Sequence, residues 1–271
     1  MRDARGSLDN TTTLILRPAE RAAGLTRLVE AAGGLVITCP LVRRELISDD
    51  SRELVDKATR DLGQFGWVAV TSVNAVDELT ASLERTHPGT PLSVVAAQTR
   101  WATVGPATTR ALEAKGIVVN FEAAENSAAG MLAAWPEQGR ERGRVLLPLG
   151  DLATSQLQDG LAAMGYATTR VTVYRTVTIP ATSEALEAYR YGEIDAVIAS
   201  SGSVVREFVK QFDPLAAAQL GGELPALVAI GSPTARTANA MGLSVTTIAT
   251  TATDHGLFDA LERAINLSKE Y

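Results

Sequence analysis

The chain has 271 residues, of which 46% are hydrophobic and 21% charged, a composition typical of a globular protein long enough for two domains. Its net charge of −6 disfavours nucleic-acid binding, because proteins that bind nucleic acid usually carry a basic face. Two histidines and one cysteine disfavour a zinc site and exclude an internal disulfide. Without a signal-peptide core or an apolar run of about 18 residues, we expect a cytoplasmic protein that is not bound to a membrane.

The first predicted elements are a strand at residues 14–16 and an amphipathic helix that ends at Gly33. A β-branched and aromatic run then predicts a short buried strand at residues 67–70. The hydroxyls of Thr71 and Ser72 follow this strand and suit the N-cap of a helix. Strands that alternate with helices in this way indicate a parallel sheet with helices on both faces.

Gly105 and Pro106 begin the next predicted helix, because glycine allows a tight turn and proline suits the first helical position. The second half of the chain repeats these patterns in the same order, about 130 residues later. Three matches in the same order predict a duplicated α/β unit. The matching strands are expected at residues 14–16 and 145–147, at 68–70 and 197–199, and just before Gly105 and Gly231.

Four loops between a predicted strand and the next helix consist of small, hydroxylated and nearly uncharged residues. The first N–H groups of a helix carry partial positive charge, so a neighbouring Ser or Thr hydroxyl completes a pocket for a carboxylate or phosphate. Simple helix capping is the plainer interpretation of any one loop, whereas four loops in repeated pairs favour a shared binding cleft. The loops cover residues 71–74, 105–108, 200–203 and 231–234, and none contains a nucleotide-binding glycine motif.

Four further residues give weaker signals. Cys39 ends a predicted strand without a histidine partner in the sequence pattern, which disfavours a nucleophilic role. His87 lies in a predicted turn, and His255 lies at the start of the last amphipathic helix, where a structural role is favoured over that of a base. Tyr174 ends a predicted strand, and on the residues alone a structural tyrosine is the favoured interpretation.

The order and spacing of these stretches resemble the uroporphyrinogen-III synthase family, which closes the tetrapyrrole ring in haem biosynthesis. The resemblance spans residues 14 to about 265, and the Val-Tyr-Arg-Thr element at residues 173–176 is one of its more specific parts. It implies two doubly wound parallel-sheet α/β domains, joined by two antiparallel linker strands because the chain crosses over twice. The implied limits are 1–40 with 178–271 for one domain, 45–172 for the inserted domain, and 41–44 and 173–177 for the linkers.

The resemblance implies that the substrate is hydroxymethylbilane, a linear tetrapyrrole with acetate and propionate arms, handed over transiently by hydroxymethylbilane synthase. Enzymes of the family remove its terminal hydroxyl as water, invert the last pyrrole through a spiro intermediate and close the ring, with no metal or cofactor. Because this substrate closes unaided to the wrong isomer, such a lyase mainly controls geometry. We expect a monomer whose backbone amides hold the acidic arms.

The resemblance also implies roles for individual residues. Tyr174 matches the prominent tyrosine of the family, whose phenol could assist departure of the hydroxyl, and Thr234 is the second catalytic candidate. Leu149 and Thr154 stand where relatives often carry arginine, so either backbone groups compensate or binding is weaker. The substrate-binding candidates are Arg17, Thr71, Ser72, Asn74, Gly105, Thr108, Ser201, Ser203, Gly231 and Ser232.

Two other functional classes stay open on the sequence. A non-catalytic sensor that binds a tetrapyrrole or another anion could use the same fold and cleft. A periplasmic-type binding protein also has two α/β domains, although the missing export signal disfavours it. The isomer that forms from hydroxymethylbilane would separate an enzyme from a sensor.

Overall fold

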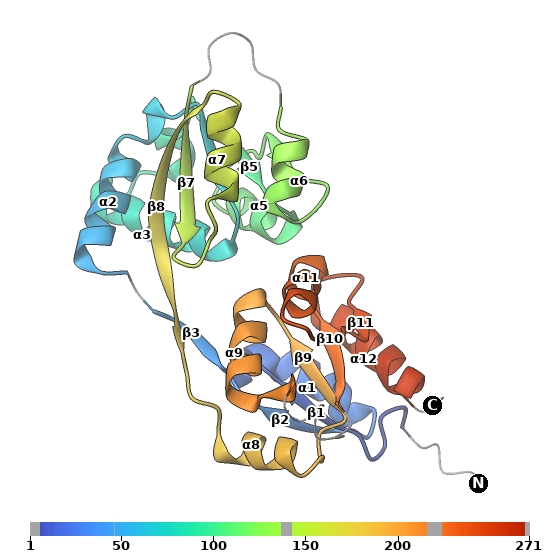
Figure 1. The fold of residues 1–271 in the computed structure, drawn as a ribbon. Coiled ribbons are helices and arrows are strands. Elements are labelled where there is room, and N and C mark those ends of the chain that lie inside the picture. Colours follow the sequence, from blue (N-terminus) through green and yellow to red (C-terminus); the bar gives the residue numbers. More distant parts are fainter. Residues whose placement is uncertain (1–5, 46, 137–142, 216–223, 269–271) are drawn as a thin grey trace. The chain divides into compact units, whose positions relative to one another are not determined.

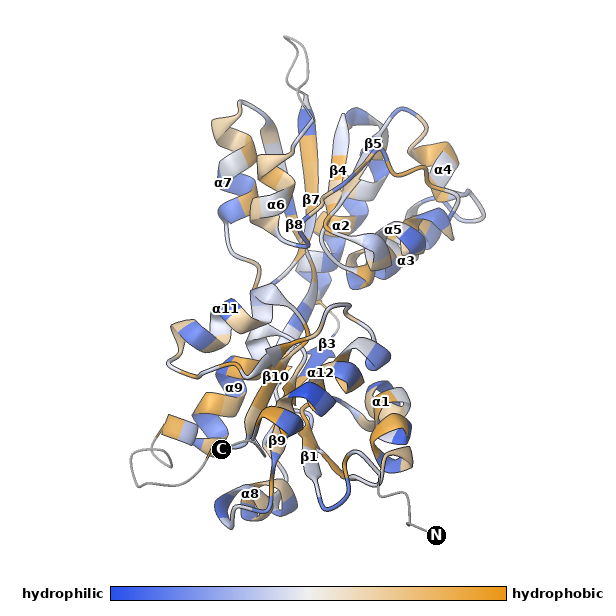
Figure 2. Cartoon of the chain, turned by 90° about the vertical axis from the view of Figure 1, so that its right-hand side faces the viewer, coloured by the Kyte–Doolittle hydropathy of each residue, from blue (hydrophilic) through white to orange (hydrophobic). Residues whose placement is uncertain are grey.

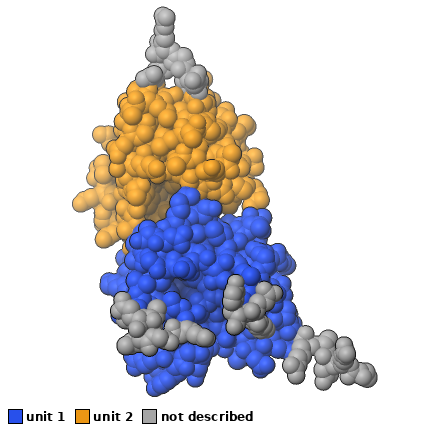
Figure 3. All heavy atoms as spheres, turned by 45° about the vertical axis from the view of Figure 1, so that its right-hand side comes forward, with its two compact units in different colours: residues 1–43, 177–271 blue, residues 44–176 orange. Residues whose placement is uncertain are grey.

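The computed structural model describes residues 6–45, 47–136, 143–215 and 224–268. The chain divides into two compact units (Figures 1 and 3): Met1–Arg43 with Val177–Tyr271 form the first, and Arg44–Thr176 form the second. The chain therefore passes from one unit to the other twice, as the predicted fold class requires. That each unit is an independent domain, with the limits predicted above, stays a prediction.

The first unit contains a five-stranded parallel sheet in the order β11-β10-β9-β1-β2. Helices α8, α9 and α11 contribute to the hydrophobic core on one face, and α1 and α12 to the core on the other. The strands are β1 (Thr12–Ile15), β2 (Leu35–Thr38), β9 (Ala196–Ala199), β10 (Ala226–Ala229) and β11 (Thr247–Ile248). The helices are α1 (Ala19–Ala31), α8 (Ser183–Arg190), α9 (Gly202–Phe212), α11 (Ser232–Ala240) and α12 (Asp254–Ser268).

The second unit contains a six-stranded sheet in the order β3-β8-β7-β4-β5-β6, in which the strands from β8 to β6 run parallel. Helices α2 to α5 contribute to the core on one face, and α6 and α7 to the core on the other. The strands are β3 (Val42–Glu45), β4 (Trp67–Val70), β5 (Arg100–Thr103), β6 (Phe121–Glu122), β7 (Arg144–Gly150) and β8 (Ala167–Thr178). The helices are α2 (Asp49–Arg60), α3 (Val73–Thr86), α4 (Leu92–Val95), α5 (Pro106–Glu113), α6 (Ala128–Ala133) and α7 (Gln156–Ala163), with a 3₁₀ helix at Leu62–Gln64.

The central strands are continuous apolar runs because helices cover both faces of each sheet. All four residues of β4, β9 and β10 are buried, and Figure 2 shows β7 and β10 as mainly hydrophobic. In an antiparallel sheet with one solvent-exposed face, apolar and polar residues would instead alternate along each strand. The surrounding helices are amphipathic, as in α9, which buries Val204, Val205 and Phe208 at helical spacing.

The two sheets record the internal repeat in their strand order. In the first unit, β1 and β2 from the first copy lie beside β9, β10 and β11 from the second copy. In the second unit, β7 and β8 from the second copy lie beside β4, β5 and β6 in the same order. The copies have therefore exchanged their first strand-helix-strand elements, and the predicted fold class of two doubly wound parallel sheets is confirmed.

One local prediction needs correction. Tyr174 does not end its strand, because β8 continues to Thr178. Strands β3 and β8 are hydrogen-bonded neighbours and overlap the two predicted linker strands. Helix α11 begins at Ser232, with Gly231 as its N-cap and Pro233 within its first two positions.

Candidate functional site

The loop after β4 positions the first group of candidates in the second unit. Ser72 is the N-cap of α3, and its Oγ accepts a hydrogen bond from the N–H of Ala75 at 3.3 Å. Thr71 precedes the cap and is partly buried. Asn74, in the first turn of the helix, accepts a hydrogen bond at Oδ1 from Nη1 of Arg44. The structure thus adds a cation to this loop that the sequence-based set of candidates omitted.

The loop after β5 forms the second group. Gly105 is the N-cap of α5 in an extended conformation, with Pro106 as the first helical residue. A methyl group on Gly105 would stand 2.5 Å from Oδ1 of Asn126, so the glycine lets this neighbour approach closely. Thr108 is only 4% exposed, which leaves its side chain little surface for a ligand. Its predicted contact with substrate stays a prediction.

Tyr174 lies against the carboxyl end of the neighbouring strand β7. The pairing of β7 with β8 shifts between Leu149 and Gly150, so that Tyr174 stands opposite Gly150. A methyl group on Gly150 would stand 2.5 Å from Cε2 and Cζ of the tyrosine ring and 2.7 Å from its hydroxyl. The ring therefore occupies the space that a larger residue at position 150 would fill, next to the strand-to-helix loops of the sheet.

Two further side chains, which the sequence did not single out, hold the loop after β7 beside this tyrosine. The backbone N–H of Asp151 donates to the carbonyl of Tyr174 at 3.1 Å, and its carboxylate accepts from the N–H of Thr176 at 3.0 Å. Nη2 of Arg170 donates to the carbonyl of Ala153 at 2.8 Å. These contacts fix the backbone on both sides of Arg175 and thereby the position of the tyrosine.

Leu149 and Thr154, the two positions where the resemblance leads us to expect arginine, have different environments. Leu149 is 2% exposed and belongs to the core formed with α6 and α7, so it has no surface for a ligand. Thr154 is exposed in the loop between β7 and α7. An arginine at position 149 would have to extend out of this core to place its charge at the surface.

The first unit repeats the arrangement with its own residues. Ser201 is the N-cap of α9: its Oγ accepts from the N–H of Val204 at 3.3 Å and lies 2.9 Å from Oγ of Ser203. Gly231 is the N-cap of α11, and a methyl group there would meet nothing nearer than Cδ of Pro233 at 3.8 Å. Ser232 is exposed, whereas Thr234 is 4% exposed like its counterpart Thr108. The catalytic role predicted for Thr234 stays a prediction.

Arg17 follows β1 and is held within the first unit by an ion pair. Its Nη1 lies 3.2 Å from Oδ1 of Asp254, the first residue of α12. Burial lowers the pKa of the Arg17 guanidinium, and the neighbouring carboxylate opposes this shift. Because one carboxylate already binds it, Arg17 would meet a substrate as part of an arginine–aspartate pair rather than as an uncompensated cation.

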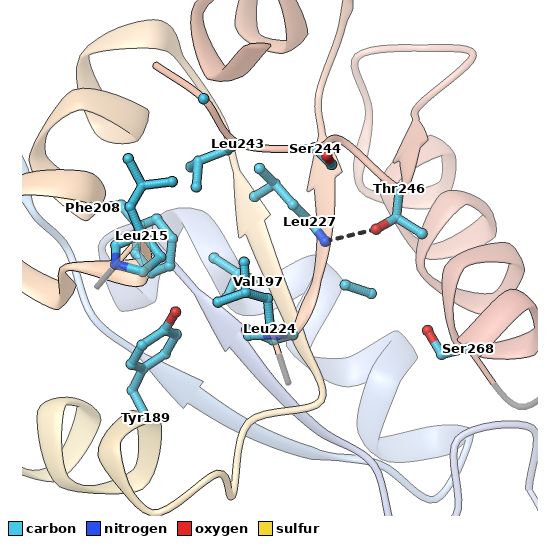
Figure 4. Close-up of a pocket in the computed structure, with 14 residues that line it drawn as sticks. Tyr189, Val197, Phe208, Leu215, Leu224, Leu227, Leu243, Ser244, Thr246 and Ser268 are labelled. Carbon is cyan, nitrogen blue, oxygen red and sulfur yellow. Dashed lines mark hydrogen bonds between the residues drawn. The ribbon is translucent and has the colours of Figure 1, made fainter. Parts of the chain in front are cut away.

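A pocket of about 290 Å³ in the first unit lies away from these loops (Figure 4). Its lining includes Leu227 at the start of β10, Leu243 and Tyr189, and none of the candidate residues. Burial raises the pKa of Tyr189 to about 12, so its phenol stays protonated at neutral pH.

The described residues contain no group of three or more His, Cys, Asp or Glu suited to a metal ion. No helix in the described ranges has the length and hydropathy that a membrane crossing requires.

The fold defines the class as a two-unit α/β protein in which serine or glycine N-caps the helices that follow the central strands. The chain belongs to the uroporphyrinogen-III synthase family, whose model, described as uroporphyrinogen-III synthase HemD, matches residues 23–259. It is 29% identical over 201 residues to a putative uroporphyrinogen-III synthase of Methanothermobacter thermautotrophicus, covering 72% of this chain and 76% of that protein. It is 24% identical over 237 residues to the porphyrin biosynthesis protein HemD of Ruminiclostridium josui, covering 87% of this chain. The match spans only 45% of that longer relative.

Solved structures of the same name share the fold. A mutant uroporphyrinogen III synthase from the extremely thermophilic bacterium Thermus thermophilus matches with a TM-score of 0.74 at 19% identity, covering 95% of this chain and 99% of that chain. The uroporphyrinogen-III synthetase of Helicobacter pylori matches with a TM-score of 0.57 at 17% identity, over 95% and 99% of the two chains. At these identities the likeness shows the architecture alone.

Proposed function

We propose that the chain is a lyase that closes hydroxymethylbilane to uroporphyrinogen III with loss of one water. The observation that carries the proposal is the repeated pair of helix starts after adjacent strands in each unit, with Ser72 and Gly105 in one and Ser201 and Gly231 in the other. Free N–H groups at such positions suit the acetate and propionate arms of this substrate. Membership of the family supports the same reaction.

The proposed reaction depends on the conformation in which the protein holds the substrate more than on a strong nucleophile. The terminal hydroxyl leaves as water, the last pyrrole attacks through a spiro intermediate and is inverted, and the macrocycle closes. The phenol O–H of Tyr174 would donate a hydrogen bond to the departing hydroxyl. Holding the acidic arms at helix starts restricts the flexible chain to the conformation from which ring inversion can follow.

The isomer that forms is the decisive test of the reaction. The protein is incubated with freshly made hydroxymethylbilane, and the macrocycles are oxidised and separated as type I and type III porphyrins. We expect the type III isomer, at a rate well above spontaneous closure. If only the type I isomer appears, at the uncatalysed rate, the protein is not a synthase and a non-catalytic binding role is favoured.

Gly231→Ala probes the helix start of α11 without disturbing the fold. Its backbone has φ 178° and ψ 171°, which any residue adopts, and the added methyl has 3.8 Å to its nearest neighbour. We therefore expect an unchanged melting temperature and turnover lowered about tenfold, because the methyl occupies space that a substrate arm needs to reach the N–H groups. Asn239→Ala, on the exposed side of α11, is the control. Gly192→Ala would not serve as a control, because the φ of 71° at Gly192 favours glycine. Full activity of the Gly231 variant would remove this loop from the site.

A further inference from the structure

Arg44 is an arginine of the second unit that contacts a neutral side chain at a helix start. It lies in β3, and Nη1 of its guanidinium donates to Oδ1 of Asn74 in the first turn of α3. Within the part of the chain that the structure describes, it has no acidic partner at ion-pair distance. Its partner Asn74 is a neutral amide, so the contact orients the guanidinium and leaves its charge in place.

Two other arginines of the second unit are paired with carboxylates. Arg52 contacts Asp49 at 2.7 Å, and Arg85 contacts both Asp56 at 2.7 Å and Glu78 at 2.8 Å. Such pairs cancel most of the charge that a ligand would feel. Arg44 thus differs from them in offering an oriented cation with unused donors.

The position of Arg44 adds its charge to that of a helix start. No acidic residue lies in the first turn of α3, whose N-terminal N–H groups carry partial positive charge. A guanidinium beside them raises the local positive potential, which attracts an anion. The planar group retains N–H donors that match the two oxygens of a carboxylate.

We infer that Arg44 is a specificity-determining residue that binds a carboxylate arm of the substrate at the start of α3. The inference rests on the proposed function, because it takes the substrate to be a polycarboxylate. It also accounts for the missing arginines at Leu149 and Thr154: part of the cationic contribution comes from β3 instead of from the loop after β7. Arg44 acts on binding and not on bond breaking.

Arg44→Gln tests the inference, with Arg52→Gln as its matched control. Both changes remove one positive charge from the same unit, but Arg52 is already paired with Asp49. We expect Arg44→Gln to raise the KM for hydroxymethylbilane about tenfold with kcat nearly unchanged, because a charge-assisted hydrogen bond made equally in ground and transition states is lost. The KM of the variant should also depend less on KCl concentration than that of the unsubstituted protein. Arg52→Gln should leave both constants unchanged.

Asn74→Asp provides a second, independent variant that keeps the side-chain volume. An acidic residue in the first turn favours the helix dipole, so the fold is retained, while Arg44 gains a carboxylate partner that competes with the substrate. We expect KM to rise about as far as in Arg44→Gln. If either variant has the same KM as Arg52→Gln while the unsubstituted protein forms the type III isomer, the inference is wrong and the proposed function stands. If the unsubstituted protein forms no type III isomer, the proposed function itself fails, and the inference with it.

Discussion

Gly150→Ala is expected to lower turnover about a hundredfold, because catalytic groups displaced by about 1 Å can lose that much activity. The added methyl would stand 2.5 Å from Cε2 and Cζ of Tyr174, a distance at which carbon atoms cannot coexist. The tyrosine ring must therefore swing away from the loop after β7, while Asp151 still fixes its backbone. The measurement is kcat for type III product, with circular dichroism to establish that the fold is retained.

A glycine elsewhere in the same unit supplies the control. Gly160 in α7 is equally crowded, since a methyl there would stand 2.4 Å from Cδ1 of Leu132 in α6. Gly160→Ala should disturb packing between these helices and lower the melting temperature, with kcat little changed. The double variant Gly150→Ala with Tyr174→Ala removes the clash together with the ring, so it should not regain turnover. Full turnover of Gly150→Ala would show that the position of the tyrosine ring does not matter.

The parts of the fold that the sequence predicted are those that depend on local pattern. A short apolar run predicted β4 at Trp67–Val70, and the hydroxyls of Thr71 and Ser72 after it predicted an N-cap, which is Ser72. The same reasoning applied to the second copy predicted β9 and a helix start at residues 200–203, where Ser201 is the N-cap. Strand periodicity, caps and glycine stops act over a few residues, so they can be recognised without knowledge of the tertiary structure.

The features that the sequence could not supply are pairs of residues far apart in the chain. Nothing near Arg44 in the sequence indicates that it reaches Asn74, and Arg17 is separated from Asp254 by most of the chain. The contact of Gly150 with Tyr174 depends on a shift in strand pairing that no residue pattern marks. Such contacts follow from sheet order, which the exchange of elements between the copies determines.

Burial was the other property that sequence pattern did not settle. Thr108 and Thr234 look like accessible hydroxyls because they follow Gly-Pro and Ser-Pro turns, yet both are 4% exposed. They lie in the first turns of α5 and α11, on the side that packs toward the sheet, as the burial of Leu112 in α5 and Ala235 and Ala238 in α11 shows. Helical position decided their burial, whereas the sequence reasoning had considered only residue type and loop.

Tyr174→Phe is expected to lower kcat about tenfold, a loss of about 1.4 kcal/mol of transition-state stabilisation. Phenylalanine keeps the ring that fills the space beside Gly150 and packs against the core of the second unit, so the fold should be unaffected. Only the hydroxyl is removed, and with it the hydrogen bond proposed for the departing water. Tyr191→Phe is the control, since this tyrosine is 73% exposed and belongs to none of the loops.

The solvent isotope effect on kcat separates the two roles that the Tyr174 hydroxyl could have. If it transfers a proton as the C–O bond of the substrate breaks, kcat of the unsubstituted protein should fall in deuterated water, and this sensitivity should be lost in Tyr174→Phe. If the hydroxyl only positions the substrate, both proteins should respond alike while the tenfold difference in kcat remains. Equal kcat values for the two proteins would exclude both roles, because the phenylalanine ring alone would then supply all that the reaction requires at this position.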